Sequence, residues 1–95
     1  PLELRTDRGA IWENFLISER IKQNEYKESL AKTYFWRTKQ QQEVDFVEDK
    51  AGKIYGYEFK WSDKKKVKLP RRFVESYNAN EKVIDRKNFR EFVII

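Results

Sequence analysis

The side chains with the clearest chemical potential in this sequence are Asp45, Glu58 and Lys60. Residues 53–61, KIYGYEFKW, alternate in the manner of a β-strand, and side chains two apart on a strand point from the same face. Glu58 and Lys60 therefore share a face. An acid and a lysine placed together on the inner face of a sheet need partners, because unpaired charges are costly to bury.

Asp45 lies one hairpin upstream of Glu58, within the alternating segment 43–49. The segment 50–52, Lys-Ala-Gly, predicts a tight turn whose glycine takes a positive φ. An antiparallel pair closed by this turn brings Asp45 and Glu58 close together. If residues 49 and 53 pair at the ends of the turn, the strand register differs by one residue from the register that sets Asp45 opposite Glu58. A β-bulge would absorb this difference.

Two carboxylates a few ångströms apart repel each other unless a proton or a cation sits between them. Carboxylate oxygens are the ligands that Mg²⁺ and Mn²⁺ prefer, so we expect Asp45 and Glu58 to hold Mg²⁺ (or Mn²⁺). Such an ion lowers the pKa of its bound water and stabilises charge on a phosphate. Lys60 would orient or deprotonate that water, or stabilise the charged transition state.

The absent residue types narrow the chemistry further. The 95 residues include no Cys and no His, which excludes thiolate nucleophiles, Ser-His hydrolases and zinc sites built from these ligands. An enzyme with this composition has to use Asp, Glu, Lys, Arg, Tyr, Ser or Thr. The sequence has no apolar stretch near the ~18 residues of a membrane span and no signal-peptide pattern. We therefore expect a cytoplasmic protein without a membrane partner.

The positive charge is concentrated in one segment. The net charge is +5, and residues 60–72, KWSDKKKVKLPRR, carry seven basic residues against one acidic residue. Such a cluster is typical of a protein that binds a polyanion, although a solvated loop that keeps the protein soluble has the same appearance. The residues expected to contact nucleic acid are Arg37, Lys64, Lys65, Lys66, Lys68, Arg71 and Arg72. Arg37 would either position a phosphate or pair with Asp45 or Glu43.

The periodicity of apolar residues predicts a single α/β domain over residues 1–95. Residues 1–8 have no period and suggest a lead-in strand or an irregular connection, whereas residues 9–24 have helical spacing. Aromatic and β-branched residues then alternate, as in strands. The predicted order is αβββαβ with a further strand at the end: a helix at 9–24, strands at 33–39, 43–49 and 53–61, a helix at 71–79, and strands at 82–85 and 89–95.

Several side chains can be assigned to faces from these patterns. Ile11, Trp12, Phe15 and Leu16 fall on one broad face of the first predicted helix. In the segment 43–49, alternation predicts Val44 and Phe46 on one face, with Asp45 and Val47 on the other. Trp36, Tyr57 and Trp61 could stack on nucleobases, but aromatic residues at period two are more often part of a core.

The order of these residues resembles a known nuclease signature. Asp45, followed after a short hairpin by Glu58-Phe59-Lys60, is similar to the D…(D/E)xK motif of the PD-(D/E)xK nuclease superfamily, although Val44 stands where proline often precedes the aspartate. That superfamily has a restriction-endonuclease-like αβββαβ core with a mixed sheet flanked by helices. The closest resemblance is to the uncharacterised C-terminal domain of bacterial and archaeal AAA-type ATPases, through GAIWENFLISE (9–19), YFWRTKQQQEVDFV (34–47) and KIYGYEFKWS (53–62).

The resemblance implies a further site residue and a larger parent protein. Many members of the superfamily place a glutamate from the first helix in the site, and here either Glu13 or Glu19 would fill that role. The chain has no Walker A motif, so we expect the ATPase domain upstream of Pro1, with this domain a C-terminal part of a larger ATPase. Many nucleases of this fold dimerise to cut both strands, which leaves a homodimer open.

Two classes of function follow from the sequence. The first is metal-dependent phosphodiester hydrolysis, with DNA as the expected substrate and RNA not excluded. The second is a nuclease-like module without catalytic activity that binds DNA or a protein for the attached ATPase. The intact set of Asp45, Glu58 and Lys60 favours the first.

Overall fold

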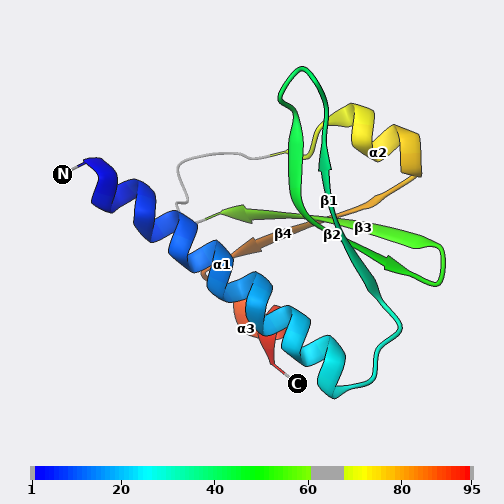
Figure 1. Cartoon of the computed structure of the whole chain (residues 1–95), viewed down its shortest axis with the longest axis horizontal. Coiled ribbons are helices and arrows are strands. Elements are labelled where there is room, and N and C mark those ends of the chain that lie inside the picture. Colours follow the sequence, from blue (N-terminus) through cyan, green and yellow to red (C-terminus); the bar gives the residue numbers. More distant parts are fainter. Residues whose placement is uncertain (1, 61–67, 95) are drawn as a thin grey trace.

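A four-stranded mixed β-sheet forms the centre of the molecule, with helices on both of its faces (Figure 1). The structure is a computed structural model that describes residues 2–60 and 68–94, with the side chains of residues 2–8 left out. The elements are α1 (Leu2–Tyr26), β1 (Lys32–Arg37), β2 (Glu43–Lys50), β3 (Lys53–Lys60), α2 (Arg71–Tyr77), β4 (Asn80–Asp85) and α3 (Phe89–Val93). The α/β fold and the αβββαβ order predicted from the sequence are confirmed.

The strands lie in the sheet in the order β1-β2-β3-β4. The first three form an antiparallel meander, and β4 adds to β3 in parallel after the connection that contains α2. A parallel neighbour requires such a crossover, because the chain has to return to the starting end of the sheet. The predicted turn at 50–52 is present: β2 and β3 are joined through Ala51 and Gly52, and Gly52 has a φ of 90°.

The two faces of the sheet carry separate hydrophobic clusters. On one face, α1 and α3 cover a cluster made of Leu16, Phe46, Tyr57, Phe59, Ile84 and Phe92. On the other, α2 and the residue before it cover a smaller cluster made of Val44, Val47, Leu69 and Phe73. The ring of Phe92 joins three others in the first cluster, because it packs against those of Phe46, Tyr57 and Phe59 at centroid distances of 5.9, 5.0 and 5.7 Å.

A β-bulge in β2 corrects the predicted assignment of side chains to faces. Tyr34 pairs with Val47 and Trp36 with Val44, so three steps along β2 match two steps along β1. The extra residue interrupts the alternation. Val44 and Val47 consequently lie in the α2 cluster while Phe46 lies in the α1 cluster, so the prediction that Val44 and Phe46 share a face is wrong.

Two predicted elements at the ends of the chain were also wrong. The first helix begins at Leu2 rather than at residue 9, because leucine, glutamate and arginine favour helix even without an apolar period. Residues 89–93 form α3 instead of a strand. Phe89, Phe92 and Val93 have the i, i+3, i+4 spacing of a helix face, and the β-branched end of the chain obscured that spacing.

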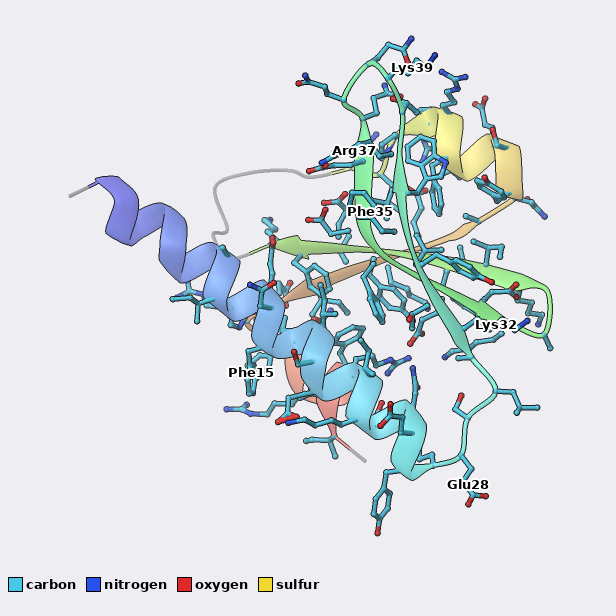
Figure 2. The ribbon with its side chains drawn as sticks, in the orientation of Figure 1. Phe15, Glu28, Lys32, Phe35, Arg37 and Lys39 are labelled. Atoms are coloured by element: carbon cyan, nitrogen blue, oxygen red, sulfur yellow. The ribbon has the colours of Figure 1, made fainter. Side chains whose placement is uncertain are left out.

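The buried face of α1 is narrower than predicted. Leu16 is fully buried, and Trp12 packs against the same cluster from a half-buried position. Ile11 is 66% exposed and Phe15, labelled in Figure 2, is 49% exposed. Among the described helices, none has an apolar stretch long enough to cross a lipid bilayer.

Candidate functional site

The open end of the β2–β3 hairpin holds the predicted acidic residues. The antiparallel ladder runs from Lys50↔Lys53 to Phe46↔Tyr57 and ends there. Extending the same register by one residue sets Asp45 opposite Glu58, and the two-residue turn provides this register without a bulge between β2 and β3. Because the ladder has ended, the two side chains lie where the strands separate.

Carboxylates from three elements line one small cavity at this point. Its volume is about 150 Å³, and its lining comes from α1, β2 and β3: Glu13, Glu43, Asp45, Tyr57, Glu58 and Phe59. A cavity of this size and polarity has room for an ion or several water molecules. The structure thus brings Glu13, Asp45 and Glu58 together from positions that are far apart in the sequence.

The electrostatics of this carboxylate cavity show a shortage of positive charge. Burial, and then the charges of Asp45 and Glu13, raise the pKa of Glu58 to about 7. Burial and the neighbouring acids also raise the pKa of Glu13. Burial and the charge of Glu43 raise the pKa of Asp45, although the positive charge of Arg37 partly offsets this increase. Near neutral pH, the cavity therefore either keeps a proton or gains from a bound cation.

Among the described residues, these acids are not arranged as a complete set of metal ligands. Within residues 2–60 and 68–94, no group of three or more acidic side chains is arranged so that it could hold a metal ion. A site here would therefore rest on fewer protein ligands. Mg²⁺ commonly binds through only one or two carboxylates and keeps several of its waters.

Lys60 does not line the carboxylate cavity. It is half-buried at the end of β3, where the sheet register sets it opposite Asp85 of β4. The backbone N–H groups of Lys87 and Asn88 lower the pKa of Asp85, and the charge of Lys60 adds to that effect. The structure thus places Lys60 beside Asp85 and outside the lining of the cavity that holds Asp45 and Glu58.

The structure distinguishes between Glu13 and Glu19 as the helix residue at the cavity, and it shows which acid pairs with Arg37. Glu13 lines the cavity, whereas Glu19 forms an ion pair with Lys22 one turn further along α1 at 3.5 Å. Arg37 forms an ion pair with Glu43 at 3.3 Å rather than with Asp45. Glu13 is accordingly the helix carboxylate of this site.

The predicted nucleic-acid contacts are distributed over several places. Lys64, Lys65 and Lys66 lie outside the described residues, and Lys68 is exposed. Arg71 forms an ion pair with Glu81 of β4 at 2.6 Å, so its charge is partly neutralised. Arg72 instead lines a groove beside the end of β1.

The aromatic candidates for base stacking belong mostly to the core. Tyr57 is buried, and half-buried Trp36 packs edge-on against Phe73 at a centroid distance of 5.3 Å. Trp61 lies outside the described residues. The core interpretation is therefore confirmed for Tyr57.

A buried polar network that the sequence pattern did not indicate lies beside the site. Glu48 is 0% exposed and accepts hydrogen bonds from Arg20 Nε at 3.0 Å, Asn24 Nδ2 at 2.8 Å and the Tyr57 hydroxyl at 2.8 Å. Arg20 also donates to the Phe92 carbonyl, so the network ties α1 to β2, β3 and α3. One sequence signal for this network was the position of Glu48 two residues after Phe46. This spacing places an acid on the same side of a strand as a large ring and indicates a buried acid that needs partners.

Fold and site together define an α/β domain with a paired-carboxylate cavity at the open end of a hairpin. The chain belongs to the family described as Domain of unknown function (DUF4143), which matches residues 8–94. No curated protein and no solved structure matches the chain.

Proposed function

We propose that this domain is a metal-dependent phosphodiesterase of the PD-(D/E)xK type that acts on nucleic acid, with DNA as the expected substrate. The observation that carries the proposal is the carboxylate cavity, in which Glu13, Asp45 and Glu58 meet and each has a pKa raised by burial and by neighbouring acids. A buried cluster of like charges is costly for folding alone, and perturbed pKa values of this kind are typical of functional sites.

Asp45 and Glu58 are the proposed ligands of Mg²⁺ or Mn²⁺, and Glu13 is close enough for its charge to raise the pKa of Glu58. When bound, the ion lowers the pKa of a water and stabilises negative charge on the phosphate. The protein's part is to hold the two carboxylates in register across the hairpin, while α1 closes the cavity from one side.

Lys60 supports a second candidate function. Its place opposite Asp85, outside the lining of the cavity, favours a nuclease-like module that binds nucleic acid or protein without cleaving it. Domains of this family are often found with AAA ATPases, so either function would serve an ATPase domain in a parent chain.

Metal binding tests the proposal most directly. In a calorimetric titration with millimolar Mn²⁺, we expect the chain to bind the ion, and Asp45→Asn and Glu58→Gln to weaken binding by about tenfold or more, because each removes a charged ligand. Glu19→Gln is the matched control, since Glu19 lies outside the cavity. Affinity should rise between about pH 6 and pH 8, because Glu58 must lose its proton to bind.

Cleavage separates the two candidate functions. An active preparation should nick supercoiled DNA only with Mg²⁺ or Mn²⁺, and Lys60→Ala should abolish nicking while it leaves the affinity for Mn²⁺ unchanged. Binding of Mn²⁺ without any nicking, in the presence of the ATPase domain as well, would establish the non-catalytic module. If Mn²⁺ causes no perturbation at Asp45 and Glu58, the metal-dependent nuclease is wrong.

A further inference from the structure

A second concave surface lies between the β1–β2 hairpin and α2. The acids of the carboxylate cavity lie on the other side of this hairpin. This basic groove has a volume of about 470 Å³ and is bounded by the end of β1, the turn that follows it, and α2. The lining residues used below are Trp36, Arg37, Lys39, Arg72, Ser76 and Tyr77. Figure 2 shows Arg37 and Lys39 at the tip end of the hairpin, beside α2.

The charge of the groove has one sign. Its charged lining residues are Arg37, Lys39 and Arg72, and no carboxylate is among the lining residues. Arg37 is paired with Glu43, but neither Lys39 nor Arg72 forms an ion pair with any residue in the described ranges 2–60 and 68–94. Two exposed cations without an ion-pair partner favour a polyanion over a neutral ligand.

An aromatic ring stands beside these cations. Tyr77 is 50% exposed, and its ring packs against buried Phe73 at a centroid distance of 5.5 Å. Trp36 packs against the same Phe73 ring, so the aromatic wall of the groove is anchored in the core. A fixed, half-exposed ring next to cations is the arrangement on which unpaired bases stack in proteins that bind single strands.

The basic groove and the carboxylate cavity share a boundary. Arg37 lines the groove, Glu43 lines the cavity, and the two side chains form an ion pair at 3.3 Å. A nucleic-acid strand that extended from the groove to Asp45 and Glu58 would therefore pass close to this ion pair.

We propose that the basic groove binds a single-stranded segment of nucleic acid, with Lys39 and Arg72 on its phosphates and Tyr77 stacked on one of its bases, and leads that strand into the carboxylate cavity. The last step rests on the proposed nuclease function, whereas the binding does not. Single strands are favoured over duplex because base pairing hides the base faces that Tyr77 would contact. The Ser76 hydroxyl, which also lines the groove, supplies a donor for a phosphate oxygen.

Fluorescence anisotropy with a labelled 20-nucleotide oligothymidine, in EDTA so that no metal contributes, tests the groove. We expect the double substitution Lys39→Gln/Arg72→Gln to weaken binding about tenfold and to reduce the slope of log affinity against log salt by about 1.4, which is two phosphate contacts on a single strand. Arg72→Lys should keep most of the affinity, since it keeps the charge. Tyr77→Leu should weaken binding at least fivefold, because stacking is lost while an apolar contact with Phe73 remains.

The matched control is Lys27→Gln/Lys87→Gln, which removes two exposed lysines outside the groove. The groove proposal is overturned if this control weakens binding as much as the groove variant, or if a 20-base-pair duplex binds as tightly as the single strand. Asp45→Asn should bind the oligonucleotide at least as well as the parent chain. A failure of metal binding would leave this result unaffected, so the two proposals can fail separately.

Discussion

At the scale of single residues, Glu58 is an acid whose negative charge is unfavourable in the folded protein. Its pKa of about 7 is set by burial and by Asp45 and Glu13, against an ordinary value of 4.5. The folded protein binds this proton more tightly than the unfolded chain. The contribution of Glu58 to the stability of the metal-free protein is therefore most favourable below about pH 4.5. This contribution is lost as the pH rises towards and through about 7.

Glu58→Gln should remove this pH dependence. We expect the variant to be about 1 kcal/mol more stable than the parent at pH 8, after discounting for partial exposure, and equally stable at pH 4.5. Urea unfolding in EDTA measures the difference. Glu25→Gln, an exposed change on α1, is the control and should have no effect at either pH. An equal gain at both pH values would contradict the argument, since it would not come from charge.

Glu48 presents the opposite case, because its charge is fully compensated. Burial alone would raise its pKa, but hydrogen bonds from Arg20, Asn24 and Tyr57 and the Arg20 charge lower it to about 2. This stabilisation is present above about pH 4.5 and is lost as the pH falls towards 2. The charge of Glu48 therefore stabilises the fold, whereas the charge of Glu58, three β-ladder steps away, destabilises it.

Arg20→Met should cost about 3–5 kcal/mol, because the fully buried Glu48 carboxylate loses both hydrogen bonds from the guanidinium and keeps only Lys50, at 3.6 Å, as a cationic partner. Thermal and urea unfolding at pH 7 measure the loss. The double variant Arg20→Met/Glu48→Gln should recover part of the lost stability, since the buried carboxylate charge is gone. If the double variant is no more stable than the single one, the cost comes from packing of the arginine stem and not from the charge.

At the scale of elements, the parts of the fold governed by local pattern were predictable. Alternation in residues 53–60 and the Ala51-Gly52 turn fixed the β2–β3 hairpin and with it the approach of Asp45 to Glu58. The bulge in β2 was not predictable, because it depends on how Tyr34 and Trp36 pair with a neighbouring strand. The position of Lys60 opposite Asp85 was not predictable for a similar reason, because Asp85 comes from a parallel strand that is distant in sequence.

Gly56 shows how closely α2 packs against β3. A Cβ atom at this position would lie 2.6 Å from Cε2 of Phe73 and 2.8 Å from Cδ1 of Leu69, both of them buried. Gly56→Ala should destabilise the protein by about 1–3 kcal/mol, because the core around it has no room to shift.

The natural comparison is Gly9→Ala in α1, where a new Cβ meets nothing within 4 Å. This change should stabilise the protein by about 0.5–1 kcal/mol through helix propensity. Urea unfolding of both variants gives the two values. A gain in stability for Gly56→Ala would show that α2 sits further from the sheet than the structure has it.

At the scale of the whole molecule, the net charge of +5 is held by residues 60–72, and the rest of the chain is close to neutral. Binding to DNA should therefore weaken steeply as salt rises. Substitution of Lys64, Lys65 and Lys66 by glutamate should weaken binding by about the same factor for every DNA sequence, as anisotropy with unrelated duplexes and single strands can measure. Unchanged binding would reduce this segment to a role in solubility.

The order of strands in the sheet has a kinetic consequence. β1, β2 and β3 are neighbours both along the chain and in the sheet, whereas β4 joins β3 only after a long connection. Short loops close faster than long ones, so the β2–β3 hairpin should form before β4 is added. Pulse-labelled hydrogen exchange should find amide protection in β2 and β3 ahead of β4. Asp45 and Glu58 would then meet early during folding, and the protein should reach its native state faster in mildly acidic solution, where Glu58 still carries its proton.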